Sequence, residues 1–380
     1  MTTHLDFKET TFYEQLQNCP NIDLRSNQGK RRTLNFILLG LTIGLLRNRD
    51  GNLSSIHRSM QNKNVELCSF LAIPVQVVVS RSHLPKVLHK VNLCAFEKLL
   101  FDNFGITLSK TEKEWFAGDG KELRGSIEKG NKRGQALVQL VKHGDRDVLG
   151  QAFYNGKKES EKPCLRGLIE QTGAKNQKIT TDALHLNPST TSPINQAGGI
   201  FLIGLKGNQE ILYKSMKKYA GTAVPIDQKT TIEKGHGRVE TRSYFHYDIS
   251  ELSFADRWSK TGFKSLFKVE RLRYECTTKK ESHEIDYYIS NGEKAEKEDY
   301  FSAIRNHWSV EVSNHVRDVT LKEDHLKTKQ PPVSKVLAGL RTLTIKLLGL
   351  IKPKNMVAQL ELFSDKFQEL LCWLRGINFI

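Results

Sequence analysis

The sequence predicts a mixed α/β fold with a helical N-terminal part, and three patterns lead to this prediction. Apolar residues recur at helical spacing over residues 30–105. Short apolar runs separated by turn residues begin at Trp115, and a strand-rich block without a strong helix covers residues 224–292. Strands that alternate with helices in this order indicate a sheet domain with at least one crossover connection.

The first predicted elements are helices with basic residues between them. The apolar run at residues 33–46 has 14 residues before Arg47, which is too short to span a bilayer and is typical of a buried helix. Cations lie on both sides of it, at residues 29–32 and 80–90. Two interpretations stay open for this part: a solvated helix surface, or a DNA-contacting unit of the helix-turn-helix type. The sequence singles out no recognition helix.

From Trp115 onward, Gly and polar residues end each apolar run, as expected for short strands joined by turns. One run is instead apolar at helical spacing and stops at Gly173, which predicts a helix with a glycine cap. A Pro-containing connection follows at residues 187–198. The predicted strands before residue 224 lie in residues 114–123, 135–145, 147–157, 178–186 and 199–209. The predicted helices lie in residues 161–174, 297–325 and 334–351.

The bulk composition indicates a protein of a reducing cytoplasm with a polyanionic partner. The chain has 380 residues, enough for two or three domains, and 58 Lys plus Arg against 42 Asp plus Glu give a formal net charge of +16. Such an excess of positive charge favours nucleic acid as the partner. The alternative is a basic protein without a polyanionic partner. The six cysteines form no CxxC pair, which argues against a disulfide framework or a thiolate zinc site. The N-terminal segment has no apolar run of the secretory type, and we predict no membrane span.

Three acidic residues are candidates for a metal site. Asp119 and Asp182 each lie at or just after the end of a predicted strand, where open sheets place functional side chains, and Glu311 lies on a predicted helix. Three carboxylates from two strands and a helix can hold two Mg²⁺ ions, which prefer oxygen ligands. Their spacing alone is weak support, because an acid in such a position is more often a cap or a solvated charge.

The segment at residues 305–325 is unusually acidic for so basic a chain. On an ideal helix, His307, Glu311, His315 and Asp318 share one face that could bind a metal. A zinc hydrolase that uses His307, Glu311 and His315 is one alternative. However, the HExxH motif is missing, and three ligands spread over two helical turns fit a single tetrahedral ion poorly. Nucleotide hydrolysis is weaker still, since no stretch has the complete phosphate-binding loop pattern.

Several ordered motifs resemble the H-repeat-associated transposases of bacterial insertion sequences, which belong to the DDE superfamily. The similarity covers about residues 25–350. GDGKELRGS and TTDALHLN resemble the two motifs that carry the aspartates, and NHWSVEVSNHVRDVTLKEDH resembles the motif that carries the glutamate. Together these motifs are specific, whereas none is specific alone. The further similar stretches are SRSHLPKVLHKVNLCAFE, IGLKGNQ and GHGRVETR.

The resemblance implies a ribonuclease-H-like catalytic core, a mixed sheet flanked by helices, with a β-rich insertion and an N-terminal helical domain. It also implies that Asp119 bridges two Mg²⁺ ions, or Mn²⁺ instead, while Asp182 and Glu311 bind one each. We expect four segments: a helical, DNA-binding domain at residues 1–110, the first part of the core at 111–223, the insertion at 224–292 and the C-terminal helices of the core at 293–380.

Nine further residues are candidate DNA contacts. Residues 206–209 follow a predicted strand and could contact the scissile DNA strand or simply form a turn at Gly207. Trp308 could stack on an unpaired base, although a Trp at this spacing also fits a core position. The nine candidates are Lys121, Arg124, Lys206, Asn208, Gln209, His236, Arg238, Arg242 and Trp308.

These expectations describe a cytoplasmic, nucleoid-associated transposase that cleaves the ends of its element and joins the 3′-hydroxyl strand to target DNA. Its partners would be the terminal inverted repeats, target DNA and a second copy of the chain. The family usually has Asn after the glutamate and a second His-Trp pair, where this chain has Val312 and His315-Val316. The alternatives are therefore a decayed or repurposed DNA-binding protein, and another nuclease of the same fold.

Overall fold

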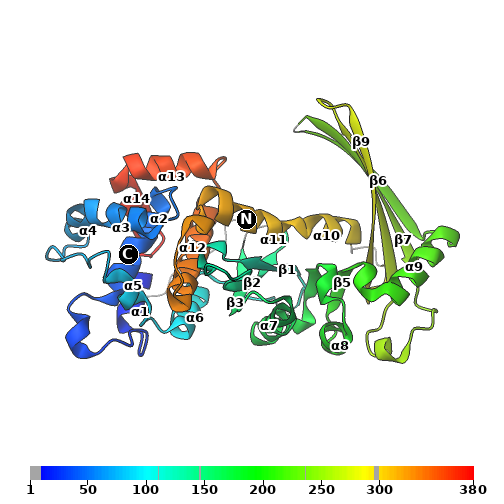
Figure 1. Ribbon diagram of the computed structural model, residues 1–380, viewed down its shortest axis with the longest axis horizontal. Helices are drawn as coiled ribbons and strands as arrows, with labels where there is room; N and C mark the ends of the chain where they lie inside the picture. Colours follow the sequence, from blue (N-terminus) through cyan, green and yellow to red (C-terminus); the bar gives the residue numbers. More distant parts are fainter. Residues whose placement is uncertain (1–9, 110, 145–146, 236, 295–298) are drawn as a thin grey trace.

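The computed structural model describes residues 10–380, except residues 110, 145–146, 236 and 295–298. Nine strands form one mixed sheet, and helices flank it (Figure 1). The mixed α/β class predicted from the sequence is therefore confirmed. The strands are β1 (Trp115–Glu122), β2 (Ala136–Lys142), β3 (Val148–Tyr154), β4 (Lys178–Thr181), β5 (Ile200–Leu205), β6 (Asp227–Gly235), β7 (Arg238–Asp248), β8 (Ser265–Glu275) and β9 (Lys280–Ser290).

The sheet has the strand order β3-β2-β1-β4-β5-β9-β8-β7-β6. β1, β4 and β5 are parallel neighbours, whereas β2 and β3 form antiparallel hairpins beside β1. β9 pairs with β5 in antiparallel fashion and joins the four long strands β6–β9 to the rest of the sheet. These four strands project from the body of the molecule, and we call them the arm (Figure 1).

Helices fill the N-terminal part of the chain. The predicted buried helix is α2, in which every residue except Arg47 at the C-terminus is buried. Its apolar side chains share one core with helices near the C-terminus, so segments far apart in the sequence form a single helical body (Figure 1). Within the described ranges, none of the helices combines the length and the apolar character that a membrane span requires. The helices of this body are α1 (Phe12–Asn18), α2 (Leu34–Arg47), α3 (Leu53–Asn62), α4 (Asn64–Phe70), α5 (Leu84–Leu88), α6 (Leu93–Phe104), α12 (Pro331–Ile351), α13 (Met356–Asp365) and α14 (Phe367–Gly376).

Opposite faces of the sheet contact different helices, because successive side chains of a strand point to opposite sides. Phe116 of β1 shares an apolar cluster with α7, whereas the next residue, Ala117, packs against Val310 of α11. The glycine stop predicted for α7 is present, since Gly173 follows the helix with a φ of +72°. The remaining helices are α7 (Lys158–Gln171), α8 (Pro188–Gln196), α9 (Glu210–Thr222), α10 (Tyr300–Asn306) and α11 (Trp308–His315).

Two features differ from the sequence-based expectation. The predicted Pro-containing connection forms α8, because Asn187 caps the helix and Pro188 occupies its first turn, where a missing N–H costs nothing. The helix expected over residues 297–325 is divided: α10 ends at Asn306, and a π-helical turn at residues 316–320 follows α11. This π-turn changes the helical phase after His315.

Candidate active site

Asp119 lies on β1, an inner strand of the sheet between β2 and β4. Gly118 and Gly120 on either side of it face α7, and a Cβ atom on Gly120 would lie only 2.6 Å from the carboxyl carbon of Glu161. The two glycines therefore let α7 approach the strand closely. From α11, the side-chain amide of Asn314 donates a hydrogen bond of 3.2 Å to Asp119 Oδ2. Asp119 is thus enclosed by the sheet and a helix on each side.

Asp182 directly follows β4, the parallel neighbour of β1. Gly118 pairs with Thr181 in this ladder, so Asp119 and Asp182 are the next residues of adjacent strands at the same edge of the sheet. The Oδ1 atom of Asp182 accepts a hydrogen bond of 3.1 Å from the backbone N–H of Leu184. This bond caps the short 3₁₀ turn after the strand and fixes the backbone of Asp182.

Glu311 reaches the same region from α11. Its neighbour Val310 is fully buried in a cluster with Ala117 of β1 and Val141 of β2, which anchors the helix to the sheet. Glu311 itself is exposed and lines two adjoining cavities, both of which also include Trp308. The three predicted acids therefore come from two strands and a helix around one region of the molecule.

The electrostatics of these acids indicate that they influence one another. Burial raises the pKa of Asp119 to about 7, and the charges of Asp182, Glu161 and Glu311 add to this increase. Partial desolvation also raises the pKa values of Asp182 and Glu311, although both residues remain exposed. Among the described residues, however, no three His, Cys, Asp or Glu side chains stand close enough to hold an ion as they are.

A fourth acid, Glu161 of α7, was not predicted from the sequence. Its carboxylate accepts a hydrogen bond of 2.9 Å from the Tyr154 hydroxyl and lies 3.3 Å from His185 Nε2. Its charge raises the pKa values of both aspartates. One sequence signal could have identified it: Glu161 precedes Leu165 by four residues and therefore lies on the buried face of its helix.

The predicted contacts at residues 206–209 have partners within the protein. Asn208 Nδ2 donates a hydrogen bond of 2.6 Å to the carbonyl of Ala183, and Gln209 Nε2 donates one of 2.7 Å to the carbonyl of Leu186. Both amides therefore hold the turn that follows Asp182. Lys206 is exposed, and its positive charge offsets a small part of the increase that desolvation causes in the pKa of Asp182. Within the described part of the chain, the ammonium of Lys206 is therefore the group of this motif that is available to a ligand.

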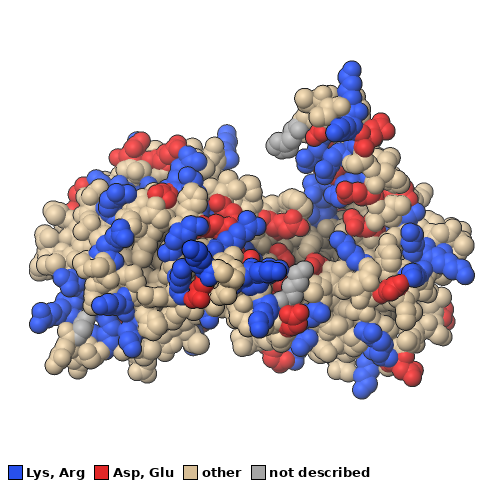
Figure 2. All heavy atoms as spheres, in the orientation of Figure 1, with Lys and Arg blue, Asp and Glu red and all other residues tan. Residues whose placement is uncertain are grey.

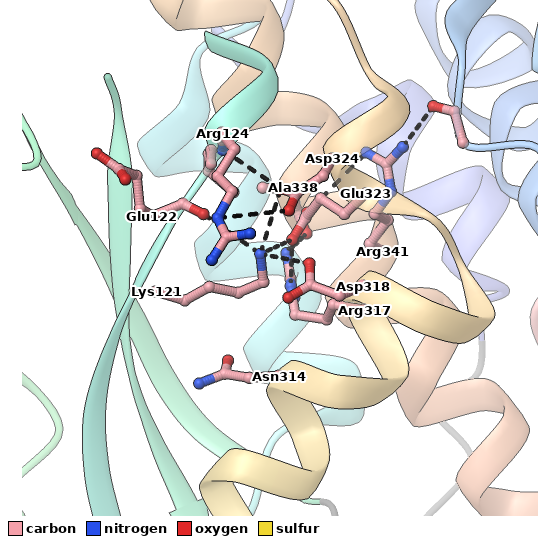
Figure 3. Close-up of polar contacts among 12 residues, drawn as sticks. Lys121, Glu122, Arg124, Asn314, Arg317, Asp318, Glu323, Asp324, Ala338 and Arg341 are labelled. Atoms are coloured by element: carbon pink, nitrogen blue, oxygen red, sulfur yellow. Dashed lines mark hydrogen bonds and ion pairs between the residues drawn. The ribbon is translucent and has the colours of Figure 1, made fainter. Parts of the chain in front are cut away.

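Lys121 has a different environment from the one predicted for a phosphate contact. Only 7% of the residue is exposed, and its ammonium lies 2.7 Å from Asp318, 3.4 Å from Glu323 and 3.8 Å from Asp324 (Figure 3). The prediction that Lys121 contacts a DNA phosphate therefore gains no support, because its ammonium is buried among carboxylates. Arg124 lies at the surface beside it, with 74% of its side chain exposed.

Of the candidates on the arm and on α11, Arg242 and Trp308 line one cavity. Arg242 forms ion pairs with Glu233 and Glu240, and Arg238 is exposed near Glu240. The prediction for His236 lies outside the described residues. Trp308 is 53% exposed, so the core position that its spacing also allowed is wrong.

The helical face predicted to bind a metal forms only in part. Its four predicted members are His307, Glu311, His315 and Asp318. His307 precedes α11, and its Nδ1 atom lies 3.0 Å from the hydroxyl of Thr180 on β4. Burial lowers the pKa of His307 to about 4. The other three residues line one cavity together. The orientation of His307 toward the sheet gives no support to the zinc-site alternative.

Comparison with known proteins adds independent information. Residues 97–347, which include all three predicted acids, match the family described as the transposase DDE domain. YbfL of Escherichia coli (strain K12) is 31% identical over 255 residues, which are 63% of this chain and 65% of that protein. YhhI of the same strain, provisionally named an H repeat-associated transposase, is 30% identical with the same coverage. YncI of E. coli O157:H7, provisionally named a transposase, is 29% identical over 73% of this chain and 71% of its own length. The match thus spans about two thirds of the length of these relatives.

Proposed function

Because the chain belongs to the family of DDE transposases, we propose that it is the transposase of a bacterial insertion sequence and uses two divalent ions for DNA cleavage and strand transfer. The observation that carries this proposal is that Asp119 and Asp182 follow paired residues of the neighbouring strands β1 and β4, while α11, which packs on β1, supplies Glu311. The order β3-β2-β1-β4-β5, antiparallel and then parallel, supports a ribonuclease-H-like core.

The donor chemistry of the site fits Mg²⁺ or Mn²⁺, since carboxylate oxygens are the ligands that these ions prefer. Within the described residues, no Lys, Arg or His forms an ion pair with Asp119 or Glu311, so both carboxylates lack the cation that would lower their pKa values. Asp119, Asp182 and Glu311 would together hold the two ions. When bound, the ions neutralise charge at phosphorus and lower the pKa of a coordinated water or 3′-hydroxyl.

The chain also offers a path for DNA to this site. An open space lies between the arm and the helical body, and α10 and α11 form its floor (Figure 2). Three cations line the cavity at its base, Arg242 and Arg271 from the arm and Arg305 from α10. Trp308 and Glu311 belong to the same cavity. All three arginines also pair with carboxylates of the protein, so DNA phosphates would replace part of these ion pairs, while the exposed ring of Trp308 would stack on a base.

Replacement of Trp308 by Ala should weaken binding of DNA with an unpaired end. Stacking of a base on an aromatic ring contributes roughly 1–3 kcal/mol, so we expect an increase in Kd of about 5- to 150-fold. Fluorescence anisotropy with a partly single-stranded duplex measures this effect. Trp308→Phe keeps an aromatic face and should retain most of the affinity. Equal affinity of Trp308→Ala and the wild type would exclude Trp308 from the DNA interface.

Replacement of Asn208 by Ala should slow cleavage without weakening DNA binding. The substitution removes the hydrogen bond to Ala183 and so loosens the turn that fixes Asp182. One lost hydrogen bond costs about 1 kcal/mol, and a displaced Asp182 should lower the single-turnover cleavage rate on the order of tenfold. Asn131→Ala is the control, because Asn131 is exposed and forms only a 3.4 Å hydrogen bond to Glu128. A normal rate in Asn208→Ala would contradict a positioning role.

The remaining parts of the proposal concern partners and location. The basic N-terminal helices would bind the terminal inverted repeats, together with the arm, and a second copy would join on paired ends. The four-segment division stays a proposal, although one apolar core contains side chains from residues 12–104 and from residues 316–380. A cytoplasmic location, at the nucleoid, follows from a DNA substrate in bacteria.

The direct test of the proposed function is incubation of the purified protein with Mg²⁺ and duplexes from the regions that flank its reading frame. Transposition predicts Mg²⁺-dependent breaks that leave 3′-hydroxyl ends, followed by their joining to a second duplex. Binding without any cleavage would instead support a decayed or repurposed transposase. Cleavage of branched DNA without preference for the flanking sequences would support another nuclease of this fold.

A further inference from the structure

Six charged side chains form a cluster beside the candidate active site, and we call it the ion network (Figure 3). Three are cations and three are anions, and the exposed Arg124 adds a further cation at 3.8 Å from Asp324. Arg317 and Arg341 are fully buried, and Glu323 is 3% exposed. Burial of isolated charges would be very costly, which means that these groups depend on one another. The members are Lys121, Arg317, Asp318, Glu323, Asp324 and Arg341.

The centre of the network is Glu323, which has cationic groups on several sides. Arg317 donates two hydrogen bonds of 2.8 Å to it, one to each carboxylate oxygen. Lys121 lies 3.4 Å away and Arg341 4.0 Å away. Arg317 also donates to the hydroxyl of Thr342 and to the carbonyl of Ala338, both on α12, at 2.8 and 2.9 Å. The π-turn that carries Arg317 is therefore fixed to α12.

Lys121 connects this assembly to the catalytic strand. It lies on β1, two residues after Asp119, and its closest partner is Asp318 Oδ1 at 2.7 Å. Asp318 is in the π-turn directly after α11, which carries Glu311. The Lys121–Asp318 pair therefore joins the two elements that supply the first and third acids. Its position in a mostly buried environment makes the pair stronger than one in water.

We propose that Lys121 is a positioning residue that sets the location of Glu311 relative to Asp119 by holding the π-turn against β1. This inference rests on the proposed function, because it concerns how the same three acids are arranged. Arg317 fixes this π-turn to α12, and the ion pair of Lys121 with Asp318 is its link to β1. A displacement of about 1 Å at an active site can lower the rate about a hundredfold.

The main variant is Lys121→Met, which keeps the unbranched shape and most of the length of the side chain and removes its charge. Three measurements are made on the variant and the wild type: duplex affinity as a function of salt, single-turnover cleavage at saturating duplex, and the increase in melting temperature with Mg²⁺ concentration. We expect affinity within about twofold of wild type, cleavage lowered at least about tenfold, and a higher Mg²⁺ concentration for half of the thermal shift. Lys366→Met, which removes a cation from an exposed ion pair, is the control and should match the wild type in all three.

Two alternatives give different results. If Lys121 bound a DNA phosphate, its loss would weaken affinity, lower the slope of log K against log salt by about 0.9, and leave cleavage at saturating duplex unchanged. If Lys121 acted on stability alone, the melting temperature would fall while the Mg²⁺ midpoint stayed at its wild-type value. Either result overturns the proposal, and so does wild-type behaviour in every measurement.

Asp318→Asn provides a second route if Lys121→Met does not fold. Asp318 is more exposed than Lys121, with 39% of its side chain accessible, so this variant leaves a smaller buried imbalance. It should show the same loss of cleavage and the same Mg²⁺ shift, and the double variant should be little worse than either single one.

If the wild type does not cleave, the proposed function fails, while the Mg²⁺ midpoints still test the positioning role. Absence of any Mg²⁺ effect on the wild type would overturn both.

Discussion

Replacement of Asp119 by Asn is expected to remove Mg²⁺-dependent strand cleavage and to leave duplex affinity close to that of the wild type. Asn has the same size, but its neutral amide cannot bridge two cations. Divalent ions contribute several kcal/mol of transition-state stabilisation in such reactions, so the loss should be at least about 10³-fold in the single-turnover rate. End-labelled duplexes from the flanking regions, followed over time with and without Mg²⁺, measure it. Equal nicking by variant and wild type would remove Asp119 from the mechanism.

The stability of the same variant shows whether a loss of cleavage reflects chemistry or unfolding. The folded-state pKa of Asp119, about 7, lies above its ordinary value of 3.8. Ionisation of Asp119 therefore opposes folding: the cost is absent below pH 4, increases as the pH rises and is complete above pH 7. Without metal, Asp119→Asn should be more stable than the wild type at pH 8 and similar to it at pH 4, as measured by denaturant unfolding. Asp102→Asn, at an exposed ion pair, should show no such difference between the two pH values.

Local patterns predicted much of the fold because they depend on neighbours in the sequence. The apolar run before Arg47 is α2, and the helix that stops before Gly173 is α7. The strand-rich block at residues 224–292 contains β6–β9. The helix α8 was missed, since the effect of two prolines depends on their positions relative to the cap at Asn187. Sequence patterns also did not predict that the first and last helices share one core, because local patterns carry no information about contacts between distant segments.

Motifs allowed the sequence to nominate site residues by type. They could not predict the role of a residue that depends on contacts with distant parts of the chain. Asp119, Asp182 and Glu311 came from motifs, and the structure brings them to one region. Lys121 looked like a phosphate contact because it is a cation in a basic chain, whereas its buried ion pairs depend on residues about 200 positions away. Glu161 was missed because it belongs to no motif and reaches the site only through the packing of α7 on β1.

Replacement of Glu323 by Gln is expected to destabilise the protein more than any exposed substitution. Gln keeps the size of the side chain but leaves Arg317 and Arg341 buried with too little negative charge. Loss of one partner from a buried ion pair costs about 3–5 kcal/mol, which corresponds to a fall in melting temperature on the order of 10 °C. Glu361→Gln is the matched control, because Glu361 is 59% exposed in its pair with Arg49 and should cost less than about 1 kcal/mol.

The pH dependence of this difference follows from the cause of the stabilisation. Burial alone would raise the pKa of Glu323, but the surrounding cations, Arg317 first, lower it to about 2. Its folded-state pKa is thus below the ordinary value of 4.5, so its contribution is complete above pH 4.5 and is lost as the pH falls toward 2. The gap in unfolding free energy between wild type and Glu323→Gln should therefore be constant near neutrality and shrink in acid. A gap that is small at pH 7, or that widens in acid, would mean that the charge of Glu323 does not hold the network together.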